Sequence, residues 1–265
     1  MAVPNARWLA AVLLAGCGFE ATPLEEDMPD PTPPGGVDPA VERKCATSDD
    51  TLRLCIDFED TATLAGDGSG RGHHPAIADS LTTMTRDAEL AVQMSALSRL
   101  QIAETGDLDL GTNLTVSMWM RPESRPAGDA AFAMLDNDTQ YAISYRDDGR
   151  VRCSIGEDAV DSILPVLSRT WSHVACTYDG SMMRVWVDGS LAGCEARAGE
   201  IANTGTIGTA IGADLSAGPA FADPFIGGLD NVQVFARAWT ASQLCLAAGH
   251  GSANDCVDVC LGSGD

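Results

Sequence analysis

The sequence predicts an all-β sandwich of antiparallel strands that ends in one short helix. From Cys45 onward, short apolar runs with a period of two recur between turn residues. Asp-Gly pairs at 148–149, 179–180 and 188–189 are typical of two-residue type I′ turns, which join antiparallel strands. Strands do not alternate with long helical segments, and this excludes a fold built from βαβ units.

The predicted strands occupy 52–58, 89–94, 99–102, 114–120, 131–135, 141–146, 151–155, the stretch from Trp171 through the two later Asp-Gly corners, 207–211 and 225–235. One helix is expected over 241–247. Thr240 is a good N-cap for this helix, and Gly249 can end it.

Composition limits the classes of partner. Residues 45–265 suffice for one sandwich domain and are too few for two comfortable ones. The chain has 38 acidic residues against 16 Lys and Arg. Such a surface keeps a protein soluble but disfavours a phosphate backbone, so nucleic acid is excluded as a partner.

The N-terminal residues predict export. Residues 1–16 carry Arg7, a short apolar run and then small residues, which is the pattern of a cleaved secretory signal. The ending Leu-Ala-Gly-Cys resembles a bacterial lipobox, which implies lipidation of Cys17 and a lipid anchor as the only membrane contact; the alternative is an ordinary signal with an incidental cysteine. Residues 17–44, rich in Pro and acid, are expected to form a disordered tether before the domain at 45–265. Gly18 is not the aspartate associated with inner-membrane retention, so the outer membrane is the expected location.

The cysteine count favours disulfide bonds. Nine cysteines without a CxxC pair argue against zinc, and setting Cys17 aside leaves an even number for an oxidising compartment. The eight candidates are Cys45, Cys55, Cys153, Cys176, Cys194, Cys245, Cys256 and Cys260. Cys153 and Cys176 lie on consecutive strands and are the best single pair. Cys245, Cys256 and Cys260 are expected to tie the helix and tail to the body or to the Cys45 region, and the other pairings stay open.

Pairing outward from the last two Asp-Gly corners sets residue 178 opposite 181 and 187 opposite 190. This register puts Cys176, Met183 and Cys194 in one row across three strands. Cys176 and Cys194 would then lie about 9.5 Å apart, beyond the reach of a disulfide.

Three stretches resemble the laminin-G-like and concanavalin A-like jelly-roll domains, a superfamily that includes the pentraxins. The central one is Trp-x-His-Val-Ala-x-Thr-Tyr-Asp-Gly from Trp171, followed by Val-x-Val-Asp-Gly; the others are LTVSMWM at 114–120 and FIGGLDNVQVF at 225–235. The resemblance covers roughly Leu52 to Ala248. It implies a two-sheet jelly roll that acts as a recognition module for a glycan or a surface protein.

The same resemblance implies a possible calcium site. Asp67, in a loop rich in glycine, and Asp230, which follows two glycines, are the candidate ligands. The alternative is that Asp67 caps a turn and Asp230 is an Asx residue in a strand bulge.

Two other functions remain open. The endoglucanases of this superfamily use a Glu-x-Asp-x-x-Glu strand; the nearest match, around Asp57 and Glu59, lacks the first glutamate. No Gly-x-Ser-x-Gly motif occurs, and the adjacent His73 and His74 make a poor chelating pair. We therefore expect a non-catalytic protein, with a carbohydrate-active hydrolase or lyase as the first alternative and a purely structural surface protein as the second.

Overall fold

A computed structural model describes residues 45, 47–128, 130–215 and 221–260. The predicted signal at 1–16, the lipidation site Cys17 and the tether at 17–44 lie outside these residues. No helix in the described part of the chain is long and apolar enough to cross a membrane.

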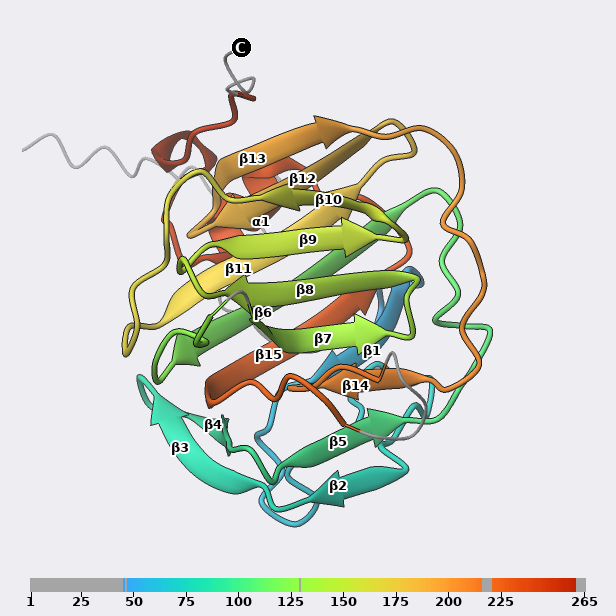
Figure 1. Ribbon diagram of the computed structural model, residues 1–265, viewed down its shortest axis with the longest axis vertical. Helices are drawn as coiled ribbons and strands as arrows, with labels where there is room; N and C mark the ends of the chain where they lie inside the picture. Colours follow the sequence, from blue (N-terminus) through green and yellow to red (C-terminus); the bar gives the residue numbers. More distant parts are fainter. Residues whose placement is uncertain (1–44, 46, 129, 216–220, 261–265) are drawn as a thin grey trace, which may run out of the picture. The chain divides into compact units, whose positions relative to one another are not determined.

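The described strands form two antiparallel sheets that face each other (Figure 1), which confirms the predicted fold class. Sheet A has the order β13-β12-β11-β6-β15-β4-β3, with β1 beside β15, and sheet B has the order β10-β9-β8-β7-β14-β5-β2. The strands of sheet A are β1 (Leu52–Ile56), β3 (Thr82–Arg86), β4 (Glu89–Met94), β6 (Leu114–Pro122), β11 (Ser172–Tyr178), β12 (Met182–Val187), β13 (Ser190–Ala196) and β15 (Gly227–Phe235). Those of sheet B are β2 (Ile77–Asp79), β5 (Arg99–Ile102), β7 (Ala131–Asn137), β8 (Tyr141–Arg146), β9 (Val151–Ile155), β10 (Asp158–Asp161) and β14 (Thr209–Ile211).

The period-two pattern of the sequence fills the space between the sheets. On β8, Tyr141, Ile143 and Tyr145 are buried in the core, whereas the alternate residues are half-buried on the outer face of sheet B. The same alternation holds on β6 in sheet A, where Val116 and Met118 belong to the core. Each strand therefore has one side in the core and one side on an outer face.

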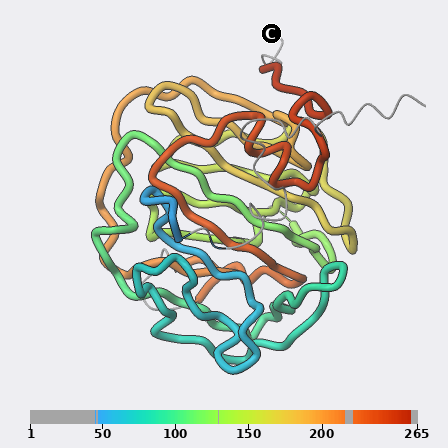
Figure 2. Tube along the Cα trace, turned by 180° about the vertical axis from the view of Figure 1, so that it is seen from behind, coloured from blue at the N-terminus to red at the C-terminus, as the bar shows by residue number. Residues whose placement is uncertain are grey.

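The C-terminal segment covers part of the outer face of sheet A (Figure 2). Helix α1 (Ala241–Ala247) begins at the predicted N-cap, Thr240, whose hydroxyl accepts a hydrogen bond from the Gln243 N–H in a capping box. A second apolar cluster lies beneath this segment and contains Trp186, Phe235, Trp239 and Leu244. The short 3₁₀ helix η1 (Ala253–Asp255) follows.

The corner between β11 and β12 differs from the predicted register. Tyr178 pairs with Met183, so the loop holds four residues and Cys176 faces Val185 rather than Met183. The carboxylate of Asp179 accepts hydrogen bonds from the N–H groups of Ser181 and Met182 at 3.0 and 2.9 Å. This Asx-type turn replaces the expected type I′ turn, since only the glycine of the Asp-Gly pair has a positive φ.

The corner between β12 and β13 is the expected two-residue turn. Val187 pairs with Ser190, and Asp188 and Gly189 both have positive φ angles. A bulge after Trp186 then shifts β13 by one residue, so Cys194 faces Arg184. The prediction that Cys176, Met183 and Cys194 form one row is therefore wrong, because neither cysteine faces Met183.

The Asp-Gly pair at 148–149 also forms a longer loop than predicted. The Arg146 N–H donates to the Arg150 carbonyl, so three residues connect β8 to β9. Only Gly149 has a positive φ there.

Four disulfide bonds join all eight candidate cysteines. They are Cys45–Cys55, Cys153–Cys176, Cys194–Cys260 and Cys245–Cys256. The expected bond between Cys153 and Cys176 is present, but its two strands lie in different sheets, so it crosses the core instead of joining neighbours. The C-terminal cysteines tie the tail to β13 and to helix α1, and Cys45 pairs with β1.

The buried cross-sheet bond supports a stability prediction. Replacing both Cys153 and Cys176 by alanine removes a cross-link between two residues that lie 23 positions apart in the sequence. Chain entropy alone predicts a loss of about 3 kcal/mol in the free energy of unfolding. Equilibrium unfolding in urea measures this loss. An unchanged unfolding midpoint would contradict the prediction. The Cys45→Ala/Cys55→Ala variant is the control and should lose less, because that bond joins β1 to the residue preceding it by only 10 positions in sequence.

Candidate functional site

One row of side chains crosses all seven strands on the outer face of sheet B. Following the strand register, the row is Ala159, Ser154, Ala142, Asp136, Ala210, Gln101 and Ile77. Asp136 is the only charged member and lies at the centre of the row. Its neighbours in the row on both sides, Ala142 and Ala210, are small.

Asp136 is held close to other carboxylates. The segment after β14 packs over it, the Leu215 N–H donates to its Oδ2 at 3.2 Å, and its side chain is only 6% exposed. Burial, together with the nearby charges of Asp214 and Asp138, raises the pKa of Asp136 to about 6. Strongly shifted carboxyl groups of this kind are more frequent at functional sites than elsewhere.

Asp138 links Asp136 to two further acidic side chains at the loop end of sheet B, Glu104 and Asp109. We call Glu104, Asp109, Asp136 and Asp138 the acidic cluster. Burial raises the pKa of Glu104, and the charges of Asp109 and Asp138 add to this effect. Neighbouring members thus repel one another, although they come from two separate stretches of the chain, 104–109 and 136–138.

Loop hydrogen bonds hold the cluster in place. Asp109 accepts hydrogen bonds from the side-chain amides of Gln140 and Asn203, both at 2.7 Å. Asp138 follows β7 and accepts from the N–H groups of Thr206 and Ile207. The result is an array of oxygen acceptors whose orientation is fixed before any ligand binds.

The charge of the acidic cluster is not neutralised by the protein. Within the described ranges, no Arg or Lys forms an ion pair with Glu104, Asp109, Asp136 or Asp138. The Oε1 atom of Gln140 is buried and has no hydrogen-bond partner among these residues. The absence of ion pairs suits the exposed and half-buried carboxylates of the cluster to a ligand rich in hydrogen-bond donors.

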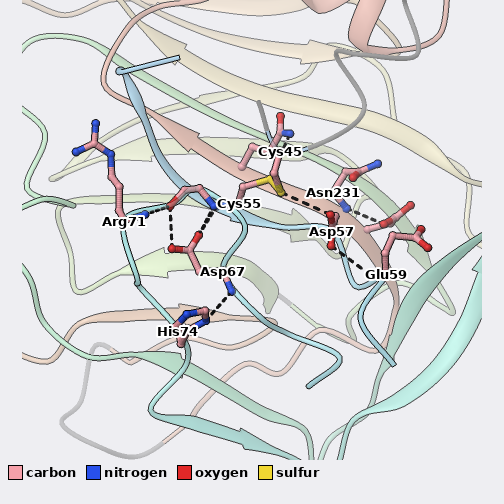
Figure 3. The surroundings of a disulfide bond; sticks show 11 residues. Cys45, Cys55, Asp57, Glu59, Asp67, Arg71, His74 and Asn231 are labelled. Carbon is pink, nitrogen blue, oxygen red and sulfur yellow. Dashed lines mark hydrogen bonds between the residues drawn. A yellow bond between two sulfur atoms is a disulfide. The ribbon is translucent and has the colours of Figure 1, made fainter. Parts of the chain in front are cut away.

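Asp67, the first candidate calcium ligand, has its carboxylate turned to its own loop (Figure 3). Its oxygens accept hydrogen bonds from the N–H groups of Cys55, Ser69 and His73 and from the Ser69 hydroxyl. The distances run from 2.8 to 3.1 Å. Asp67 therefore caps the turn, and a calcium ion would have to displace these donors.

Asp230, the second candidate, belongs to a buried ion pair. Its Oδ2 accepts a hydrogen bond from Nε of Arg86 at 2.7 Å, and both side chains are almost fully buried. The Arg86 guanidinium also lies over the ring of Trp119, 4.5 Å from its centroid. Because a cation already occupies the position, Asp230 does not fit a calcium site.

No other set of residues replaces these two as a preformed metal site. Across the described residues, the only group of three or more Cys, His, Asp or Glu with converging ligand atoms is Cys245, His250 and Cys256. The two sulfur atoms of this group are bonded to each other in a disulfide, and a thiolate is the form that binds a metal. The carboxylates of the acidic cluster do not converge in this way.

Comparison with known proteins identifies the family. A family model described as the concanavalin A-like lectin/glucanases superfamily matches residues 96–245, more than half of the 265-residue chain. The protein belongs to this superfamily. No curated protein sequence matches the chain.

Solved structures show the superfamily fold at low sequence identity. The binding domain of Paraclostridial Mosquitocidal Protein 1 has a TM-score of 0.61 at 13% identity, with 75% of this chain and 52% of that chain covered. Domain 4 of AbnA, a GH43 extracellular arabinanase from Geobacillus stearothermophilus in complex with arabinotriose, has a TM-score of 0.58 at 18% identity, with 74% and 98% covered. A putative carbohydrate binding protein from Bacteroides ovatus has a TM-score of 0.50 at 18% identity, with 59% and 46% covered. The chain thus spans about half the length of the first and third proteins.

The superfamily includes glucanases, so we tested the residues that could perform catalysis. Asp57 and Glu59 are the nearest match to a glucanase strand. Asp57 accepts a hydrogen bond from the N–H of Glu59 within its own turn, and Glu59 accepts one from the N–H of Leu90 on β4, so both carboxylates are engaged by backbone donors. The Nε2 atom of His173 lies 2.9 Å from the Ser117 hydroxyl, but both residues are buried. Burial lowers the pKa of His173 to about 3, and its Nδ1 has no partner, so no carboxylate orients this pair as a triad would require.

The sequence analysis did not identify the acidic cluster. Its members are dispersed over residues 104–138, and nothing in their spacing marks a motif. The available signal was the run Asp136-Asn137-Asp138 directly after an apolar strand, since acidic residues at a strand end lie on loops, where binding residues concentrate.

The Arg86–Asp230 pair predicts a stability change that does not depend on calcium. Replacing Arg86 by methionine leaves a buried carboxylate without its partner and is expected to lower the free energy of unfolding by about 3 to 5 kcal/mol. The double variant Arg86→Met/Asp230→Leu should recover most of this loss. Urea unfolding with calcium or with a chelator measures both variants. Stabilisation of the wild type by calcium, lost in Asp230→Asn, would contradict the structural role.

The pKa of Asp136 predicts a pH-dependent effect of its replacement. Because the folded pKa of about 6 lies above the ordinary 3.8, ionisation destabilises the folded protein as the pH rises between these values. Asp136→Asn should therefore raise the free energy of unfolding by about 2 to 3 kcal/mol at pH 8, and this gain should vanish below about pH 4.

Thermal unfolding across this pH range measures the effect. Asp161→Asn is the control with the opposite sign: burial acts to raise the pKa of Asp161, but the hydrogen bond and charge of Arg152 outweigh it and lower this pKa. An equal effect of both variants at pH 8 would contradict the account.

Proposed function

We propose that the protein is a non-catalytic recognition module that binds an uncharged, hydroxyl-rich glycan through the acidic cluster. Sugar hydroxyls donate hydrogen bonds, and the cluster presents carboxylate oxygens at the loop end of sheet B. The Asp109 carboxylate, fixed by two side-chain amides and paired with no cation among the described residues, is the observation that carries this proposal. The negative charge of the chain disfavours acidic sugars.

The proposed location in the cell rests on the sequence alone. We propose that a lipid on Cys17 anchors the protein at the outer membrane and that residues 17–44 carry the domain away from the lipid surface. Calcium has no role in the proposed binding, because Asp67 and Asp230 are engaged by protein donors.

A carbohydrate-active hydrolase or lyase is the second candidate, favoured by the raised pKa of Asp136 beside Asp138 and Asp214. A general acid needs such a pKa, but it must also reach the substrate oxygen. Asp136 is almost completely buried under the segment after β14. Recognition therefore fits the geometry better than catalysis does.

A glycan array tests the proposal directly. We expect binding to neutral glycans, equal signals with calcium and with a chelator, and no cleavage products by chromatography. Asp109→Ala should reduce binding about tenfold or more, because it removes the acceptor that orients two amides. The control Asp50→Ala removes an exposed acid elsewhere and should have no effect.

Three results would contradict the proposal. These are binding to a surface protein with no glycan on the array, binding that requires calcium, and equal binding by the Asp109→Ala variant.

A further inference from the structure

An aliphatic patch lies at the rim of the sandwich where β10 connects to β11, on the left side of the view in Figure 1. Seven large hydrophobic side chains are exposed among the described residues, and three of them, Ile163, Leu164 and Leu167, belong to this connection. Leu164 is 73% exposed and Leu167 is 66% exposed. Soluble proteins rarely expose neighbouring aliphatic side chains in this way, so the patch marks an interaction surface.

The backbone of this connection is fixed to the body of the domain. Four of its N–H groups donate to carbonyls of neighbouring segments at 2.7 to 2.8 Å: Ser162 to Val151, Ile163 to Ala192, Val166 to Gly149 and Arg169 to Pro122. Val166 also packs in the core between the sheets. The connection therefore buries one apolar side chain and holds Leu164 and Leu167 outward on a defined backbone.

A groove of about 350 Å³ continues the patch toward β13. Its apolar lining comes from Ile163, Leu164, Pro165, Val187, Leu191 and Ala192. Among the described residues, Ser190 is its only polar lining residue, and no aromatic or charged side chain lines it. The tail extends the patch, because the Leu191 N–H donates to the Val257 carbonyl at 2.8 Å and both Val257 and Val259 are exposed. Such a lining suits hydrocarbon better than a polar ligand.

Arginines surround the patch, although the chain as a whole is acidic. The rim is formed by the described stretches 121–125, 146–152 and 161–169, which the backbone hydrogen bonds above tie together. These stretches contain six arginines and four acidic residues, a local excess of two positive charges, whereas the formal net charge of the chain is −22. The patch therefore lies in a locally cationic part of the surface.

Three of these arginines are exposed and can contact an anionic group. Arg125 lies against the corner between β8 and β9, and no ion pair of the described residues includes it. Arg150 pairs with Asp148 at 3.7 Å, and Arg169 pairs with Glu123 at 2.9 Å. Surface ion pairs are weak, so a phosphate oxygen can compete for these guanidinium groups.

Hydrocarbon-like surface beside exposed arginines matches one class of partner. A phospholipid surface supplies phosphate oxygens for the guanidinium groups and acyl chains for the leucines. A second copy of the chain fits less well, because two strongly acidic molecules repel each other. We propose that this rim docks on a phospholipid membrane, with Leu164 and Leu167 inserted among the lipids and the surrounding arginines bound to phosphates.

This contact is separate from the lipid proposed on Cys17 and from the acidic cluster. The cluster lies at the other end of β8, since Asp136 pairs with Ala142 whereas the rim begins where Ala131 pairs with Arg146. The six residues of β8 span about 20 Å, while charges in about 0.15 M salt are screened beyond about 8 Å. A membrane at the rim therefore interacts mainly with the local positive charge.

Vesicle flotation tests the proposal. The full chain carries Cys17→Ser, which removes the predicted lipid attachment, and is mixed in chelator with vesicles of phosphatidylethanolamine and a minor share of phosphatidylglycerol. We expect this protein to float with the vesicles. Leu164→Ser/Leu167→Ser, made in the same chain, should lower the partition coefficient about tenfold or more, because two aliphatic side chains no longer enter hydrocarbon.

Two further variants make the result specific. Leu97→Ser is the matched control: Leu97 is 71% exposed, but it lies between β4 and β5, near the opposite edge of the two sheets. It should float like the parent chain. Arg125→Glu should weaken binding about threefold or more, and added salt should reduce the difference.

Hydrogen–deuterium exchange reports the rim itself, so it recognises any binding through the N-terminal residues. Vesicles should slow exchange in residues 162–169 and leave the corner at 95–98 unchanged. All replaced side chains are exposed, so the thermal unfolding midpoint of each variant should match that of the parent chain.

The proposal is overturned if the chain does not float, or if vesicles leave exchange in residues 162–169 unchanged. Equal flotation of Leu164→Ser/Leu167→Ser and the parent, or an equal loss in Leu97→Ser, also overturns it. A dimer in sedimentation that this double variant abolishes, without vesicle binding by the parent, would instead assign the patch to a second copy of the chain.

Discussion

The pairing of β6 with both β11 and β15 is the contact on which the rest of the structure depends. These three strands form the centre of sheet A, and they bring residues 114–122, 172–178 and 227–235 into one ladder. Alternation along them sends every second side chain into the core and the others to the outer face. The inner side supports sheet B, and the outer side carries the Arg86–Asp230 pair and the cluster under helix α1.

The alternating pattern made the fold class, most strands and the terminal helix predictable from the sequence. Local chemistry sufficed where it acts alone, as at the Thr240 cap and the corner at Asp188 and Gly189. The prediction of a type I′ turn was wrong at Asp179, because the Asp-Gly pair alone does not show which N–H groups will donate to the aspartate. That carboxylate binds two N–H groups beyond the glycine and so lengthens the turn. The bulge after Trp186 had no sequence signal that we recognised.

Contacts between distant segments account for the other differences. Asp230 meets Arg86 across 144 residues of sequence, and no local pattern records that pairing. Cys153 was paired correctly with Cys176, but as a strand neighbour and not as a partner across the core. The acidic cluster likewise joins residues from separate stretches of the chain. Residue spacing therefore predicted the fold that places the candidate site, but not the site itself.

The two outer faces of the sandwich differ in what they offer a ligand. On sheet A, the disulfide-bonded C-terminal segment packs over part of the face and leaves a cavity beside β12. On sheet B, a row of small residues surrounds a buried aspartate, and uncompensated carboxylates lie at the loop end. In this account the acidic cluster is a set of acceptors for a polar neutral ligand, because the described part of the chain supplies it with neither a paired cation nor a converging metal site.

The most direct measurement is a crystal structure of the protein soaked with a neutral oligosaccharide that it binds in solution. The account predicts an intact sugar with hydroxyl groups within hydrogen-bond distance of the Asp109 and Glu104 carboxylates and with no metal ion between them. A cleaved sugar beside Asp136, or a sugar bound through calcium, would contradict it.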